Sequence, residues 1–147
     1  MKRSKGLVAF VALLAGPALA HQGEARFTVS VVVPVQVTLE AVEQPSALMI
    51  TAEDVERGYK DVSARYRVRY NDRNGYLLRL APRAGLTREV RVRGLETEVL
   101  LGDADVEIHR PATGRCSDLA LDFRVMLDPF VRAGTYALPV HVAAAPL

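Results

Sequence analysis

Four side chains with metal-ligand chemistry alternate along one short stretch of this chain of 147 residues. They are Asp103, Asp105, Glu107 and His109, and in a β-strand all four would face the same side. A metal ion needs ligand atoms within about 2–2.6 Å, whereas same-face neighbours on one strand lie roughly 6.6–7 Å apart. One strand cannot build such a site, so we interpret the four residues as a solvated face.

Catalytic motifs are missing from the sequence. There is no G-x-S-x-G elbow, phosphate-binding loop, H-E-x-x-H pair or paired-cysteine motif. The three histidines, His21, His109 and His141, are scattered. We therefore expect neither an enzyme nor a cofactor, and no small-molecule substrate.

Cys116 is the only cysteine of the chain. In an oxidising compartment it could form a disulfide between two chains. A lone cysteine is more often a small buried hydrophobe or a tolerated loop residue. Its neighbours Arg115 and Ser117 favour the loop interpretation.

Arg65, Arg67 and Arg69 form an arginine stripe, because alternate residues of a strand share one face. Such a stripe could bind an anionic polysaccharide or an acidic patch on another protein. The alternative, which we favour, is pairing with carboxylates on neighbouring strands of the same domain.

The elements that carry these residues are predicted to be strands. Apolar residues alternate with polar ones, which is typical of half-buried strands. The predicted strands cover residues 27–39, 62–70, 76–80, 89–92, 98–101, 106–109, 119–127 and 136–142. Residues 62–80 are predicted to form a hairpin whose turn ends at Gly75, a left-handed position. Pro34 cannot donate to a ladder, so the first strand must lie at a sheet edge or break there.

Only residues 51–60 favour a helix, of one or two turns, with a cap near Thr51 and an end at Gly58. Seven or eight strands with frequent turns predict an all-β sandwich. Nothing indicates a second domain, so residues 21–147 are predicted to form a single one.

The first twenty residues are predicted to be a cleaved signal peptide. Lys2, Arg3 and Lys5 precede an apolar run over residues 7–14, and Ala18-Leu19-Ala20 matches a cleavage site. Without these three basic residues, 16 basic side chains face 17 acidic ones and the net charge falls from +2 to −1. We therefore expect an exported protein that does not bind nucleic acid.

Cleavage after Ala20 would make His21 the first residue of the mature chain. An N-terminal histidine offers an amine and an imidazole nitrogen to a copper ion. His109 or His141 would have to complete such a site. The simpler interpretation is that His21 merely follows the cleavage point.

The two ends of the mature chain carry a family resemblance. Residues 27–37 read FTVSVVVPVQV, and Arg132-Ala-Gly-Thr-Tyr136 precedes an alternating stretch that runs nearly to the C-terminus. Gly134 is the fourteenth residue from that end. Together these segments resemble secreted pilin-like subunits of the spore coat protein U type, handled by chaperone–usher pathways. The single cysteine departs from the disulfide that such subunits usually carry.

The resemblance implies an immunoglobulin-like sandwich that lacks one strand, whose groove is covered first by a periplasmic chaperone and then by a strand of another subunit. It implies a donor or edge strand of Phe27, Val29, Val31 and Val33. It implies a last strand lining the groove with Gly134, Tyr136, Leu138, Val140 and Val142. The partners would be other copies or related subunits, with a chaperone and an outer-membrane usher, in the periplasm or at the cell surface.

Two functions follow as hypotheses. The first is a structural subunit of a fimbria-like or coat assembly, joined by addition of a β-strand. The second is a stand-alone periplasmic binding module for copper, through His21, or for an anion, through the arginine stripe. A subunit needs a missing strand, whereas a binding module closes its own sandwich.

Overall fold

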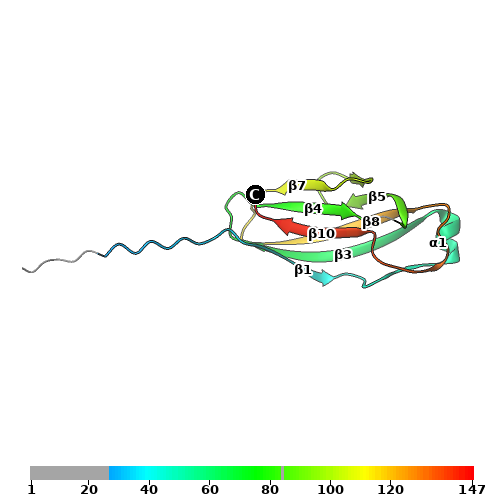
Figure 1. The fold of residues 1–147 in the computed structure, drawn as a ribbon, viewed down its shortest axis with the longest axis horizontal. Coiled ribbons are helices and arrows are strands. Elements are labelled where there is room, and N and C mark those ends of the chain that lie inside the picture. The colour runs from blue at the N-terminus through cyan, green and yellow to red at the C-terminus, as the bar shows by residue number, and fades with distance from the viewer. Residues whose placement is uncertain (1–26, 84) are drawn as a thin grey trace, which may run out of the picture. The chain divides into compact units, whose positions relative to one another are not determined.

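The computed structural model describes residues 27–83 and 85–147 (Figure 1). The chain divides between Val32 and Val33 into two parts, which are described separately. The predicted signal peptide, residues 1–20, and the copper candidate His21 lie outside the described residues. Residues 27–36 belong to no helix or strand.

The second part, Val33–Leu147, is built almost entirely of antiparallel strands. A five-stranded sheet has the order β1 (Val37–Glu43), β3 (Tyr59–Tyr70), β8 (Cys116–Leu127), β5 (Thr87–Arg93) and β6 (Val99–Leu101). A three-stranded sheet has the order β10 (Val140–Ala145), β4 (Tyr76–Pro82) and β7 (Val106–Arg110). β2 (Leu48–Ile50) and β9 (Gly134–Tyr136) form a short ribbon. The predicted all-β class is therefore confirmed.

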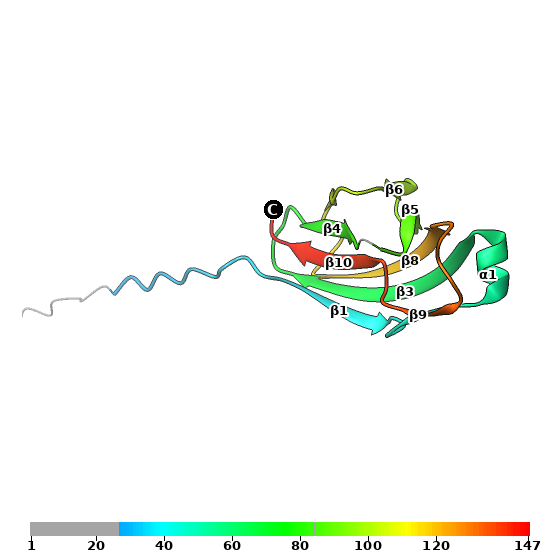
Figure 2. The ribbon, with the colours of Figure 1, turned by 45° about the vertical axis from the view of Figure 1, so that its right-hand side comes forward.

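The two larger sheets share one hydrophobic core in a sandwich-like arrangement (Figures 1 and 2). Alternate residues of β3 are buried, among them Tyr66 and Val68. β4 contributes Leu78 and Leu80 from the other sheet, both fully buried. Burying a side chain of this size stabilises the fold by about 1.5–3 kcal/mol. The alternation in the sequence thus becomes the packing of the two sheets.

The predicted hairpin over residues 62–80 is wrong. β3 pairs with β1 and β8, whereas β4 pairs with β10 and β7 in the other sheet. The turn between them carries the chain across the core, and the rings of Tyr70 and Tyr76 pack with their centroids 5.0 Å apart. Gly75 has a φ of 104°, the positive value predicted for it. A Cβ at Gly75 would overlap the carbonyl oxygen of Arg110, which explains the glycine.

Two prolines account for further differences in the strands. The alternation over residues 27–39 is interrupted at Pro34, and β1 begins only at Val37, where it forms the border of its sheet. The predicted strand over residues 136–142 is split by Pro139, which has no N–H for a ladder. β9 and β10 therefore belong to different sheets, and with β2 the strand number becomes ten in the described part of the chain.

The one helix found in the described residues, α1 (Ala52–Arg57), has the predicted ends. The backbone N–H of Asp54 donates to Oγ1 of Thr51 at 3.2 Å, and the N–H of Thr51 donates to Oδ2 of Asp54 at 3.0 Å. Gly58, with a φ of 77°, ends the helix. Asp54 is buried and also accepts hydrogen bonds from Arg57 and, at 2.8 Å, from Lys60. These donors hold the pKa of its carboxyl far below the ordinary value, the bond from Lys60 contributing most.

Candidate strand-docking groove

Only one edge of β10 is paired with another strand of the described residues. β10 pairs with β4 in the register Val140 to Pro82, Val142 to Leu80 and Ala144 to Leu78. Among the residues that the structure describes, no strand pairs with its other edge. Figure 2 shows β10 at this border, with β4 on one side. The backbone N–H and C=O groups along that edge therefore form no ladder with another described strand.

A groove of about 370 Å³ runs between β10 and β1, which belong to different sheets. We call it the β1/β10 groove. Apolar residues line it from both strands: Leu39 and Ala41 come from β1, and Val140 and Val142 from β10. Polar atoms make up at least as much of the lining surface as apolar ones, and its polar residues include Gln44, Ser46, Arg83 and His141.

A second, much smaller hollow adjoins the β1/β10 groove. It shares three lining residues with the groove: Tyr66, Leu138 and Val140. The remaining lining of this hollow is also apolar, and includes Phe123 and Val125 of β8. With a volume of about 10 Å³ this hollow has room for no more than a water molecule, so an added strand would place its alternate side chains in the groove itself.

Three of the five residues expected to line the groove from the last strand lie there: Leu138, Val140 and Val142. Gly134 and Tyr136 instead lie in β9, paired with Ile50 and Leu48 of β2. Pro139 causes this division, as described above. The wall from β1 was missed, although Leu39 continues the alternation that begins at Phe27 and was a signal for it.

The expected donor residues lie just before β1 in the sequence. Residues 27–33, which we call the apolar segment, belong to no strand. Phe27 is 89% exposed and Val31 76%, and Val29 and Val33 are similarly exposed. Contiguous exposed apolar side chains are typical of interaction sites.

The arginine stripe lies on the outer face of the five-stranded sheet, and two of its members form ion pairs. Nε of Arg67 lies 2.8 Å from Oδ1 of Asp118, and Nε of Arg65 lies 3.4 Å from Oε2 of Glu43. The hydrogen bond from Arg67 lowers the pKa of the Asp118 carboxyl below its ordinary value. Arg69 forms no ion pair within the described ranges. Cross-strand pairing within the domain thus occupies most of the stripe.

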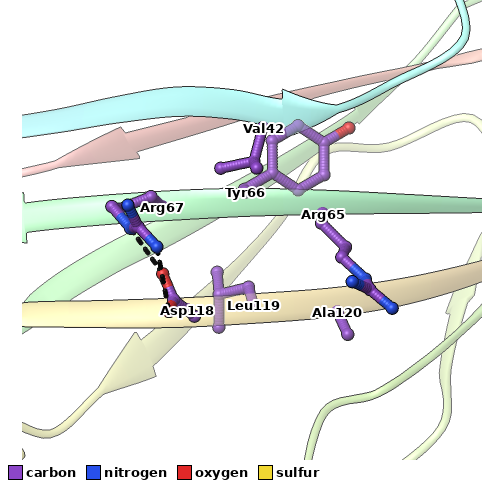
Figure 3. Close-up of a pocket in the computed structure, with 7 residues that line it drawn as sticks. All are labelled: Val42, Arg65, Tyr66, Arg67, Asp118, Leu119 and Ala120. Carbon is purple, nitrogen blue, oxygen red and sulfur yellow. Dashed lines mark hydrogen bonds and ion pairs between the residues drawn. The ribbon is translucent and has the colours of Figure 1, made fainter.

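The hollow beside this stripe is shallow and has a volume of about 350 Å³ (Figure 3). Val42 and Ala120 line it together with Arg65, Arg67 and Asp118. Figure 3 shows Arg67 directed at Asp118, so its guanidinium is already paired with a carboxylate. The arrangement offers less to an anion than the bare sequence pattern indicates.

The alternating acids around β7 serve other roles. Arg79 lies 2.6 Å from Asp105 and 4.0 Å from Glu107, and Nε2 of His109 donates to the carbonyl oxygen of Asn74 at 3.1 Å. Within residues 27–83 and 85–147, no group of three acids, histidines or cysteines could hold a metal ion.

Cys116 is exposed and free at the start of β8. It lies opposite Arg69 in the ladder with β3. The loop predicted for it is therefore wrong, because β8 is longer than its apolar alternation and begins at the cysteine.

Comparison of the chain with protein-family models, curated proteins and solved structures found no match. In the described part of the chain, no helix is long and apolar enough to cross a membrane.

Proposed function

We propose that this protein is an exported structural subunit of a fimbria-like or surface-coat assembly, and that its copies join by donor-strand pairing. The apolar segment of one subunit, with Phe27, Val29, Val31 and Val33, docks along β10 of the next. The sandwich is then immunoglobulin-like and lacks the strand that the neighbour supplies. Residues 1–20 direct export and are removed.

The observation that carries the proposal is the edge of β10, which pairs with no described strand and adjoins the β1/β10 groove. Val140, Val142 and Leu39 line this groove, where we propose that a neighbour's strand docks. A docked strand would gain main-chain hydrogen bonds from that edge. Its alternate side chains would gain burial in the β1/β10 groove.

The apolar segment has the matching pattern. Its odd positions are apolar, and in an extended strand Thr28, Ser30 and Val32 would face the other way. Moving an exposed Val or Phe into an apolar site gains about 1.5–3 kcal/mol before the costs of association are subtracted. Several such residues on one face of a strand favour a docked position in which that face is buried and the opposite face is exposed to solvent.

An uncovered groove of this kind invites unspecific pairing, because free strand edges and exposed apolar surface promote aggregation. A periplasmic chaperone that lends a strand, and an outer-membrane usher that exchanges it, would manage this hazard. We propose both as partners on the basis of the family resemblance.

The test is the mass of the protein purified after export, measured by size-exclusion chromatography with light scattering under reducing conditions. We expect polymers that resist SDS until boiled, and a Val29→Asp/Val31→Asp variant that stays monomeric. The matched control is Thr28→Asp/Ser30→Asp, which adds the same charge in the opposite phase and leaves the polymers. A wild-type monomer that unfolds cooperatively contradicts the proposal.

A further inference from the structure

Asn71 holds the chain just before β1. Its Nδ2 donates to the carbonyl oxygen of Pro34 at 2.8 Å, and its Oδ1 accepts from the backbone N–H of Gln36 at 2.7 Å. Its own backbone N–H donates to the carbonyl oxygen of Gln36 at 3.2 Å. We call these three bonds the Asn71 clamp.

The clamp extends the pairing of β1 with β3. The ladder between these strands ends at Val37 opposite Tyr70. Asn71, the next residue of the chain, continues the contact with its backbone at Gln36 and with its side chain at Pro34. Pro34 has no N–H, so its carbonyl is the only main-chain group there that a clamp can use. Residues 34–36 are thereby held at Asn71, just before β1 begins at Val37.

The clamp restricts the turn that the apolar segment would need to reach the groove of its own subunit. The β1/β10 groove runs along β1 itself, through Leu39 and Ala41. To enter the groove of its own subunit, the apolar segment would have to reverse its direction between Val33 and Val37. Residues 34–36 are the only ones available for that turn without shortening the segment, and the clamp holds two of them.

We infer, given the proposed function, that the Asn71 clamp prevents the apolar segment from entering its own groove and so reserves it for a second copy of this chain. A restraint is needed because a strand tethered by a short flexible linker reaches an effective concentration in the millimolar range. Without the restraint, docking within the same chain would be favoured over docking of a neighbouring subunit at micromolar concentration by a factor of about 10²–10³. A linker that cannot make the turn reduces the effective concentration to nearly zero.

The test compares Asn71→Ala with the wild type, both purified from the full exported chain. Light scattering gives the mass, and hydrogen exchange followed by mass spectrometry gives the protection of residues 27–33. We expect the polymer fraction of Asn71→Ala to fall at least about tenfold, as set by the effective concentration. Its monomer should still protect residues 27–33, because they occupy its own groove.

The matched control is Asn74→Ala. Asn74 lies in the same turn, and its contact with His109 uses only the backbone carbonyl, which alanine keeps. This variant should polymerise like the wild type.

Each other outcome is decisive. Asn71→Ala polymers equal to the wild type overturn the clamp but leave the proposed function intact. Monomers of Asn71→Ala with unprotected residues 27–33 also overturn the clamp, because the segment is then merely undocked. A monomeric wild type contradicts the proposed function itself, and therefore also the inference that rests on it.

Discussion

Leu39 of β1 and Val142 of β10 line the same groove from two different sheets, and no strand in the described part of the chain lies between them. These two strands form no ladder with each other, and the two apolar residues line the groove between them. The proposed docking of a neighbour's strand depends on this relationship.

The wall on β1 offers a direct way to block the groove. Ala41 lines it and is exposed, so an Ala41→Asp substitution places a charge in the groove without disturbing the core. We expect folded protein with an unchanged circular dichroism spectrum and a strongly reduced polymer fraction on size-exclusion chromatography. Thr38→Asp, exposed on the same strand and absent from the groove lining, is the control. Equal polymerisation of both variants would show that docking does not use this wall.

Gly94 is expected to be intolerant of a side chain. Its φ is 97°, and a Cβ there would overlap the carbonyl oxygen of Ala120. The positive φ alone costs a non-glycine residue about 1–3 kcal/mol. Urea unfolding of Gly94→Ala should therefore show a clear loss of stability. Gly102→Ala, where nothing lies within 4 Å of the added Cβ, should stay within about 0.5 kcal/mol of the wild type.

The Asp54 cluster predicts a pH dependence of stability. The pKa of Asp54 is lowered in the folded state, chiefly by Lys60, so its carboxylate stabilises the fold above the pKa of the unfolded chain, about 3.9. As the pH falls below that value, the unfolded state binds a proton that the folded state does not, and the stabilisation declines. The wild type should exceed Asp54→Asn in urea midpoint at pH 7, and this difference should shrink by pH 2.5. A difference that stays constant between these values would contradict the role of the charge.

Cys116 is exposed and unpaired in the described chain, yet donor-strand pairing does not need it. We expect Cys116→Ser to abolish any dimer that a reductant dissolves and to leave SDS-resistant polymers unchanged. Non-reducing gels of the boiled and unboiled protein separate the two species. Loss of the polymers in Cys116→Ser would mean that disulfides, and not strands, join the copies.

Local patterns in the sequence were sufficient for much of the fold. The alternation over residues 62–70 and 119–127 corresponds to β3 and β8, and Thr51 and Gly58 bound the helix as their chemistry predicts. The sequence predicts that carboxylates pair with Arg65 and Arg67, but it does not say which ones, because strand register decides which carboxylate lies opposite. The crossing from β3 to β4 was missed, since a turn that joins two sheets can have the same residues as a hairpin turn.

The groove itself could not be predicted from the residues alone. The groove depends on the order of the strands in the two sheets. No single segment of the sequence determines that order. Pro139 is the exception, because its missing N–H indicates where the last alternation must break. The contact between Asn71 and Pro34 likewise joins residues that are close only once β1 has paired with β3.

The most direct measurement is the binding of a synthetic peptide with the sequence of residues 27–35 to the full exported chain carrying Val29→Asp/Val31→Asp, which cannot dock its own copies. Hydrogen exchange would report the amides of Val140–Ala145. The account predicts saturable binding that protects β10, and none from a peptide with the same two aspartates. An unmodified peptide that leaves β10 unprotected at saturating concentration would contradict donor-strand pairing at this groove.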